Sequence, residues 1–248
     1  MGDAEVKIRV GERLKAAAEY VAVSSVRRGL VKENIVCADV GCDHGYLSIY
    51  LIEKDVCQKV YATDINESPV NIAKRNIKNR DTRGKGLTEK IDVRLCDGLD
   101  GLSDLGITHV IICGMGGEVI SGIIERASTF KIPDVTFVLQ PMSAEYELRM
   151  WLCDNGFYIN DEKLIRDSGR IYTVMFVSFT EEKHTYSQSE LILGKHNIQK
   201  GGELLFELCK RKLVHAENLL KQKMCKESDH KLYLELSQLY ENLEKGEK

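Results

Sequence analysis

Several features that mark common protein classes are missing from this chain of 248 residues. Its eight cysteines form no C-x-x-C pair and no metal-ligand spacing, so we expect no bound metal. No run of 18 apolar residues occurs, and therefore no membrane-spanning helix is expected. A secretory leader is not recognisable either, and the scattered cysteines then favour a protein of the reducing cytoplasm.

An excess of charge of one sign is also missing, since the formal net charge is only −3. Charged residues make up 29% and hydrophobic residues 43% of the chain, as in an ordinary globular domain. Such a balance neither indicates nor excludes a nucleic-acid partner, because a near-neutral total can hide a basic patch. The length suits a main domain with an appendage, and the oligomeric state stays open, a monomer being compatible with the sequence.

Apolar periodicity predicts a helix over residues 5–22, followed by strands that alternate with helices. The predicted strands are 35–40, 59–63, 91–95, 108–113 and 135–139, and the predicted helices are 46–54, 69–79, 117–126 and 145–155. This alternation indicates a parallel sheet covered on both faces. Residues 157–164 and 171–179, joined by a turn over 166–170, predict a terminal antiparallel hairpin. The combined α/β layout resembles the Rossmann-like sheet of class I methyltransferases.

Composition changes after Thr180, which suggests a main domain over residues 1–180 and an appendage over residues 181–248. Apolar residues at three- and four-residue steps predict one helix around 206–220 and a second around 232–243 with a coiled-coil seam. Residues 226–230 are predicted to connect the two helices. The appendage is therefore expected to be a small helical hairpin docked on the main domain.

The most informative stretch is Cys37 to Tyr46, where an apolar strand ends in a glycine-rich turn. Asp43 stands where the middle glycine of G-x-G-x-x-G would fall, so the turn is not the dinucleotide fingerprint, and no Walker motif follows. A carboxylate in such a loop repels a pyrophosphate and attracts a cationic ligand. S-adenosylmethionine, with its ammonium and sulfonium groups, fits this loop; the alternative is an ordinary strand-to-helix turn.

Two further predicted strands end in acidic residues. Asp64 lies just over twenty residues beyond Gly41, where an acid accepts hydrogen bonds from the ribose of an adenosine in doubly wound folds. Asp97, followed by Gly98, closes the third strand and can accept the amino group of an adenine. Three successive strand ends that carry Asp39-x-Gly41, Asp64 and Asp97 predict a site for S-adenosylmethionine.

The fourth predicted strand runs into Gly114-Met115-Gly116-Gly117. It lacks the Asn/Asp-Pro-Pro-Tyr/Phe motif of enzymes that methylate exocyclic amines, which argues against adenine N6 methylation. The glycines suggest either that backbone lines the methyl-transfer site or that the next helix needs glycine for close packing. No Pro-Cys nucleophile follows this strand, and we expect Cys113 to point into the sheet, which disfavours a 5-methylcytosine enzyme.

Motifs in a fixed order resemble those of the bacterial TrmK family, which methylates N1 of adenine 22 in tRNA. They are Arg13-Leu14, D-x-G-x-D-H-x-Y-L at 39–47, D-G-L at 97–99, G-M-G-G at 114–117, L-Q-P at 139–141, L-R-x-W-L at 148–152 and I-Y at 171–172. The resemblance covers about residues 11–179, and the helical appendage matches in kind. In one departure, Met142 stands where the family usually has asparagine, so a base-recognition role for that position is in doubt.

The resemblance implies S-adenosylmethionine as cofactor and tRNA as partner. It implies a cofactor site made of Asp39, Gly41, Asp43, His44, Tyr46, Asp64, Asp97, Gly98, Gly114 and Met115. Candidate substrate-binding residues are Arg13, Gly116, Gly117, Pro141, Lys210, Arg211 and Lys212.

Two residues are candidates for the chemistry. Asp43 is placed near the reacting atoms, or alternatively on the cofactor ammonium, and Gln140 is placed on the base edge, or alternatively as a satisfied amide at a strand end. His44 either contacts RNA phosphate or caps the following helix. Basic residues between Lys74 and Lys90 offer a second candidate surface for RNA phosphates beside the appendage.

The sequence is also compatible with other functions. A class I methyltransferase acting on another RNA, a protein or a small molecule is one alternative. A binding module that keeps the fold without catalysis is another, and the intact acids at three strand ends oppose it.

Overall fold

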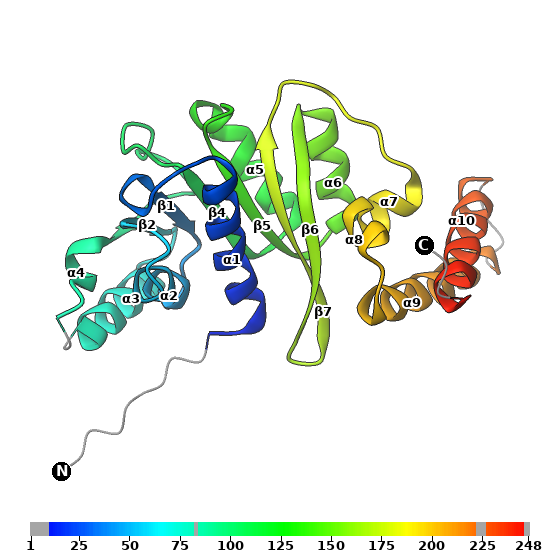
Figure 1. The fold of residues 1–248 in the computed structure, drawn as a ribbon, viewed down its shortest axis with the longest axis horizontal. Helices are drawn as coiled ribbons and strands as arrows, with labels where there is room; N and C mark the ends of the chain where they lie inside the picture. The colour runs from blue at the N-terminus through cyan, green and yellow to red at the C-terminus, as the bar shows by residue number, and fades with distance from the viewer. Residues whose placement is uncertain (1–9, 82–83, 222–226, 246–248) are drawn as a thin grey trace, which may run out of the picture.

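The computed structural model describes residues 10–81, 84–221 and 227–245 of the chain (Figure 1). Its centre is a seven-stranded sheet in the order β3-β2-β1-β4-β5-β7-β6. The strands are β1 (Val36–Val40), β2 (Lys59–Asp64), β3 (Ile91–Leu95), β4 (His109–Gly116), β5 (Thr136–Ser143), β6 (Phe157–Asp167) and β7 (Arg170–Phe179). The first five strands pair in parallel, and β7 pairs antiparallel with both β5 and β6. The predicted parallel sheet with a terminal antiparallel hairpin is confirmed.

Helices cover both faces of the sheet. One face carries α1 (Glu12–Arg27), α2 (Tyr46–Glu53), α3 (Glu67–Arg80) and the short α4 (Leu87–Lys90) in a shared apolar core. The other face carries α5 (Gly117–Arg126) and α6 (Glu145–Asp154). The central strands are buried on both sides, as in β1, where only the first of five residues is partly exposed. This is why they read as continuous apolar runs rather than alternating ones.

Some predicted boundaries differ from the structure. The first helix was expected over residues 5–22, whereas α1 begins at Glu12, after extended Gly11, and continues to Arg27; residues 5–9 lie outside the described residues. Both β4 and β5 run further than expected, because their pairing continues past a bulge at Met115 to Gly116 and Ser143. The predicted five-residue turn of the hairpin shrinks to Ser168 and Gly169, since Asp167 already pairs with Arg170.

The helical appendage consists of α7 (Gln188–Leu193), α8 (Lys195–Lys200), α9 (Glu203–Leu220) and α10 (Glu227–Lys245). Its apolar core is shared by α7, α9 and α10, and Leu164 of β6 packs against it. The predicted connection over 226–230 is wrong for residues 227–230, which form the first turn of α10, and Lys226 lies outside the described residues. Glu227 and Asp229 place negative charge at this helix N-terminus, which favours helix there.

A buried ion pair joins the appendage to the main domain. Arg149 of α6 is almost fully buried and donates to Glu162 Oε2 of β6 from Nε at 3.0 Å and from Nη2 at 2.8 Å. Its Nη1 donates to the carbonyls of Leu191 and Ile192 in α7, at 2.9 and 3.3 Å. One side chain therefore binds α6, β6 and α7 together. Glu162 Oε1 is buried with no hydrogen-bond partner, so the pair has little tolerance for the loss of either member.

Within the described ranges, none of the helices has the length and apolar character needed to cross a membrane.

Candidate active site

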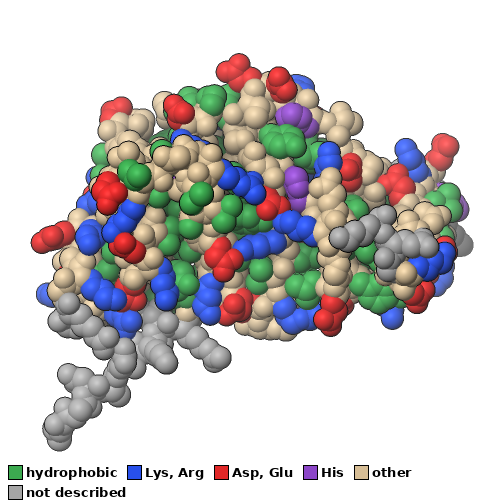
Figure 2. Space-filling model, in the orientation of Figure 1, with side chains coloured by type: hydrophobic (Ala, Val, Ile, Leu, Met, Phe, Trp, Pro, Cys, Tyr) green, Lys and Arg blue, Asp and Glu red, His purple; other side chains and the backbone are tan. Residues whose placement is uncertain are grey.

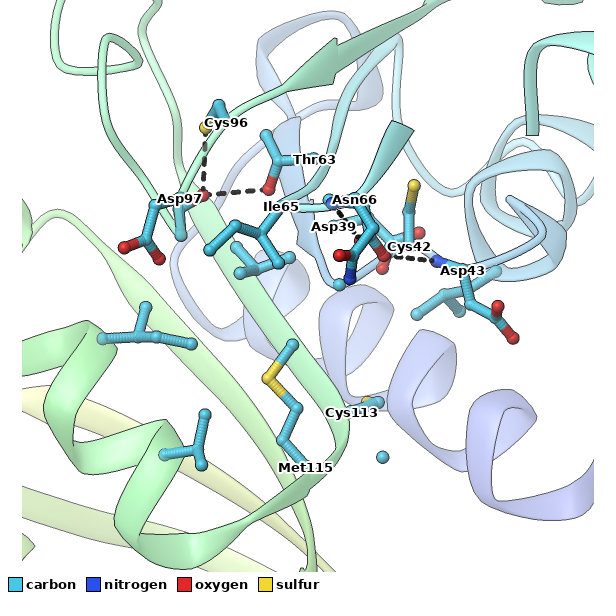
Figure 3. Close-up of a pocket in the computed structure, with 18 of the residues that line it drawn as sticks. Asp39, Cys42, Asp43, Thr63, Ile65, Asn66, Cys96, Asp97, Cys113 and Met115 are labelled. Carbon is cyan, nitrogen blue, oxygen red and sulfur yellow. Dashed lines mark hydrogen bonds between the residues drawn. The ribbon is translucent and has the colours of Figure 1, made fainter. Parts of the chain in front are cut away.

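A cavity of about 620 Å³ opens at the carboxyl ends of β1, β2, β3 and β4. The carboxyl ends of parallel strands meet at one edge of a sheet, so the acidic strand ends of the sequence converge there. The predicted residues that line it are Arg13, Asp39, Gly41, Asp43, His44, Tyr46, Asp64, Asp97, Gly98, Gly114 and Met115 (Figure 3). The remaining predicted residues, Gly116, Gly117, Gln140, Pro141, Lys210, Arg211 and Lys212, do not line it.

The loop after β1 is held tightly against β2. The backbone N–H groups of Gly41 and Cys42 both donate to the carbonyl of Thr63, at 2.8 and 2.9 Å. Gly41 has a φ of 71°, and a Cβ there would overlap the side-chain methyl of Met115. Glycine is therefore required at this position for two reasons. It adopts the positive φ readily, and its missing Cβ leaves space for the Met115 side chain, which also lines the cavity.

Asp39 is the buried acid of the site. It is 3% exposed and accepts a hydrogen bond of 2.6 Å from the Ser48 hydroxyl of α2. Burial raises the pKa of Asp39 to about 6, although the Ser48 hydrogen bond acts in the opposite direction. An ionised carboxylate here costs free energy that a cationic ligand would recover.

This pKa predicts opposite pH trends for stability and for cofactor affinity. Because the folded state holds the Asp39 proton more tightly than the unfolded chain, its contribution to stability is complete below about pH 4 and is lost as the pH rises through about 6. Urea unfolding should therefore show that the free energy of unfolding of the parent falls by about 3 kcal/mol relative to that of Asp39→Asn as the pH rises through this window. The affinity for S-adenosylmethionine should instead rise with pH, and only in the parent. Parallel pH profiles in parent and variant would contradict the assignment.

Asp64 presents its carboxylate at the end of β2. Its Oδ1 accepts from the backbone N–H of Asn66 at 3.0 Å, and its Oδ2 accepts from that of Asp43 at 3.4 Å. These bonds fix the carboxylate at the mouth of the cavity and leave acceptor capacity for two hydroxyl groups.

Asp64→Ala is expected to weaken S-adenosylmethionine binding by about 1–3 kcal/mol, because charged hydrogen bonds to the ribose are lost. Isothermal titration calorimetry measures this loss, and circular dichroism controls for the fold. A folded variant with the affinity of the parent would remove Asp64 from the cofactor site.

The loop after β3 closes the other side of the cavity. Asp97 pairs with Arg126 of α5, with Oδ1 3.1 Å from Nη2. Gly98 has a φ of 61°, and a Cβ there would lie 3.0 Å from Ile123 of α5. Its carbonyl accepts a 2.9 Å hydrogen bond from the Thr63 hydroxyl (Figure 3). The loop is thus fixed to both β2 and α5, and the Asp97–Arg126 pair spans the side where an adenine was expected.

Asp43 lines the cavity with an exposed side chain. Its side chain is 74% exposed, and Figure 3 shows the carboxylate turned away from the other labelled residues. The cause is the backbone, since a φ of 49° directs the N–H of Asp43 to Asp64 and its side chain outward. His44 lies beside it, with Nε2 3.6 Å from Asp43 Oδ1 and its ring edge-on to Tyr46. The capping role considered for His44 is wrong, because Gly45 is the N-cap of α2 and no side chain caps it.

Arg13 occupies the end of the cavity next to Gly114. Its Nη1 donates to Gln140 Oε1 at 2.9 Å and to the Met142 sulfur at 3.2 Å. Its Nε lies 3.8 Å from Asp167 Oδ2, and the guanidinium lies 5.7 Å from the ring centre of Tyr172. Contacts from β5, β6 and β7 therefore hold this cation in one orientation, with 29% of the side chain exposed.

Near this point lie three predicted substrate-binding residues, Gly116, Gly117 and Pro141, and Gln140, a candidate for the chemistry. Gln140 is fully buried, and its amide is satisfied by Arg13 and by the carbonyl of Pro141, so it faces Arg13 rather than a base. Pro141 is buried as well. Gly117 begins α5, where a Cβ would overlap the carbonyl of Ala144, and Gly116 caps that helix. The close-packing explanation therefore holds for Gly117, and of these three glycines Gly114 alone lines the cavity.

Cys113 also differs from expectation, because it lines the cavity instead of pointing into the sheet. Burial, with Asp39 nearby, raises the pKa of its thiol far above the ordinary range. The thiol therefore stays protonated and is a poor nucleophile. In the described part of the chain no cluster of acids, histidines or cysteines is arranged to hold a metal ion.

Some lining residues were not identified from the sequence. Ile65 and Val119 are 64% and 54% exposed although apolar, and both face the cavity. Exposed apolar side chains at a cavity mouth suit the faces of an aromatic ring. The position of Ile65, directly after an acidic strand end, was an available signal, whereas Val119 and Arg126 reach the site only through the packing of α5.

The sheet has seven strands in this order, and acids at three successive strand ends surround a cavity that is partly lined by glycines. These features define a class I S-adenosylmethionine-dependent methyltransferase. Within that class, residues 37–248 match the family model described as "TrmK: tRNA (adenine(22)-N(1))-methyltransferase", and the chain belongs to this family. The family resemblance, the reaction and the cofactor expected from the sequence are thereby confirmed.

Known relatives agree with this assignment. The tRNA (adenine(22)-N(1))-methyltransferase of Bacillus subtilis is 24% identical over 220 residues, covering 87% of this chain and 86% of that protein. A crystal structure of Streptococcus pneumoniae Sp1610 is 26% identical, covers 95% of this chain and 99% of that one, and superposes with a TM-score of 0.77. The same protein has been solved with S-adenosyl-L-methionine, at 25% identity, coverage of 96% and 99%, and a TM-score of 0.73.

Proposed function

We propose that this chain methylates N1 of adenine 22 in tRNA with S-adenosylmethionine held between Asp39, Asp64 and Asp97 and the target nucleotide held at Arg13. The observation that supports this most is the convergence of three acidic strand ends on one cavity, beside a fixed arginine. The cofactor supplies an activated methyl group, and the rest of the chemistry depends on positioning.

The residues that line the cavity fit S-adenosylmethionine. Asp64 is placed to accept from the ribose hydroxyls, and Ile65 and Val119 offer apolar contacts to the adenine. Asp97 is placed for the adenine amino group, which would compete with its pair to Arg126. Buried Asp39 supplies negative charge at the end of β1, towards the cationic part of the ligand.

Methylation of adenine N1 needs no general base. The nitrogen carries an in-plane lone pair that attacks the methyl carbon directly, and the product base is cationic. The cavity therefore needs an in-line arrangement and a field that favours positive charge, and orientation alone is worth roughly 7–11 kcal/mol. Asp39, Asp64 and Asp97 supply that field, and no proton-accepting role is assigned to Asp43.

Arg13 is unsuited to contact a base that becomes cationic, because like charges repel. A guanidinium instead matches phosphate geometry, so we place the phosphate of the target nucleotide at Arg13. Gln140 is then a positioning residue that holds Nη1 of Arg13, and Gly114 leaves space for the base beside it. Extrusion of the base from the tRNA stem would cost a few kcal/mol, which such phosphate contacts help to offset.

We further propose a cytoplasmic monomer with a catalytic domain over residues 1–180 and a tRNA-binding appendage over residues 181–248. Lys210 and Arg211 are exposed on α9, on the outside of the appendage, and phosphate contacts need such accessible cations.

The test is methyl transfer to an unmodified tRNA transcript that carries adenine at position 22, with a transcript carrying guanine 22 as control. Primer extension should stop at position 22 only for the adenine transcript, because N1-methyladenine cannot form a Watson–Crick pair. Transfer to protein fractions, or to both transcripts equally, would overturn the proposed substrate.

A further inference from the structure

The β6–β7 hairpin lies between the active site and the appendage. Successive side chains of a strand point to opposite faces of the sheet, and the pairing of β6 with β7 is regular after the register shift near Asn160. Asp167 and Tyr172 lie on the face that contacts Arg13. Leu164 and Arg166 lie on the other face, packed on the appendage core and paired with α9 respectively. The hairpin thus contacts both parts of the proposed substrate path.

The tip of the hairpin is a tight turn. Ser168 and Gly169 both have positive φ, 49° and 77°, as in a two-residue type I′ turn, and Asp167 pairs directly with Arg170. Asp167 also accepts a hydrogen bond from the Ser168 hydroxyl at 3.2 Å. The cations beside the turn are therefore held on a short, well-defined support, not on a long loop.

Two arginines are held together on the appendage side of the tip. Glu207 of α9 accepts from both Arg166 of β6 and Arg211 one helical turn further along α9. Hydrogen bonds from these two arginines lower the pKa of Glu207 to about 2, so the carboxylate stays ionised and keeps them in place. Each guanidinium has five donors, and a single shared carboxylate leaves several of them free for another anion.

Arg170 lies on the other face of the hairpin tip, the face that contacts Arg13, because it pairs directly with Asp167 across the two strands. It is exposed, and across the described ranges no hydrogen bond or ion pair occupies its side chain. Its cross-strand neighbour Asp167 is already engaged by Arg13. The order from the cavity outward is therefore Arg13, Arg170, Arg166 and Arg211. Figure 2 shows Lys and Arg side chains interspersed with Asp and Glu side chains over the lower part of the molecule, where Figure 1 places this hairpin tip.

We propose that the tip of the β6–β7 hairpin, through Arg166 and Arg170, binds the phosphate backbone of the tRNA next to the extruded nucleotide and continues that contact to Arg211 of α9. The partner is identified by its chemistry as a polyanion with regularly spaced phosphates, and its being tRNA rests on the proposed function. The hairpin thereby sets the distance between the appendage contact and the methylated base.

A rival surface lies at the opposite edge of the sheet. An open groove of about 460 Å³ beside β3 is lined by Lys59, Lys74 and Lys78. Lys59 there donates to the carbonyl of Glu89, and Asp92 lies in the groove as well. The sheet order separates β3 from β6 by its full width, so one phosphate track from Arg13 to α9 does not pass through this groove.

The experiment measures the dissociation constant of full-length protein for an unmodified tRNA transcript at several salt concentrations. Arg166→Ala and Arg170→Ala should each weaken binding about tenfold at low salt and lower the salt slope by about 0.7–0.9. At saturating tRNA, turnover should stay within about twofold of the parent, and calorimetry should show an unchanged affinity for S-adenosylmethionine. Lys183→Ala, in the exposed linker at the opposite end of the sheet, is the charge-matched control (Figure 1).

Parent-like affinity and salt slope in both arginine variants would overturn the hairpin surface, as would a loss confined to Lys74→Ala and Lys78→Ala. Arg170→Ala decides the result if Arg166→Ala disturbs α9, because the Arg170 side chain is exposed and, among the described residues, forms no hydrogen bond or ion pair that would be lost. A parent that binds tRNA through these arginines but leaves adenine 22 unmethylated would overturn the proposed function and support the hairpin surface.

Discussion

Arg13→Ala is expected to lower kcat/KM for tRNA methylation by about 100-fold, which corresponds to about 2.7 kcal/mol of transition-state stabilisation. The reason is that Arg13 is the only cation that β5, β6 and β7 together hold at the Gly114 end of the cavity in the described part of the chain. A mispositioned nucleotide loses the in-line approach to the methyl group. Steady-state kinetics with varied tRNA measure the effect.

Two further variants test whether the loss is specific to the guanidinium of Arg13. Arg13→Lys keeps the charge but cannot engage Gln140 and Asp167 together, so it should recover only part of the activity. Lys15→Ala, which removes a neighbouring cation of the same helix that pairs with Glu12, should behave like the parent. The affinity for S-adenosylmethionine should be unchanged in all three variants. Equal kcat/KM for Arg13→Ala and the parent would remove Arg13 from the substrate site.

Arg149→Met is expected to lower the free energy of unfolding by about 3–5 kcal/mol. The substitution leaves Glu162 charged and buried without its partner, and it frees the carbonyls of Leu191 and Ile192. A loss of this size is a large part of the stability of a typical domain. Urea unfolding at neutral pH, followed by circular dichroism, measures it.

The double variant Arg149→Met/Glu162→Leu separates the charge from the packing. Removing both members takes away the stranded carboxylate, whose Oε1 already lacks a partner, so the double variant should be more stable than Arg149→Met alone. A double variant less stable than Arg149→Met would show that Glu162 stabilises the fold by contacts other than the ion pair.

The same ion pair bears on any attempt to separate the appendage. A cut after residue 182 removes α7 and thereby two of the acceptors of Arg149, whereas a chain that ends at Lys200 keeps them. The contacts of Arg149 therefore extend across the proposed boundary near residue 180 and reach α7.

Much of the site could be predicted from the sequence because its determinants are local. Apolar runs followed by Asp39, Asp64 and Asp97 place acids at the ends of strands, and the alternation of strands and helices makes those strands parallel. Parallel strands carry their ends to a single edge, so three separate positions predict one cavity. The outward direction of the Asp43 side chain could not be predicted, because its φ of 49° is not encoded by residue type.

The sequence by itself therefore determined the fold class, the edge of the sheet where the cofactor site lies, and the family to which the chain belongs. Only the tertiary structure decided that Arg13 meets Asp167, 154 residues away, that Gln140 faces this arginine, and that Arg149 joins α7 to the catalytic domain. The physical reason is that a strand end or a turn depends on neighbouring residues, whereas these contacts depend on how far strands run and on which faces helices and hairpins present after packing.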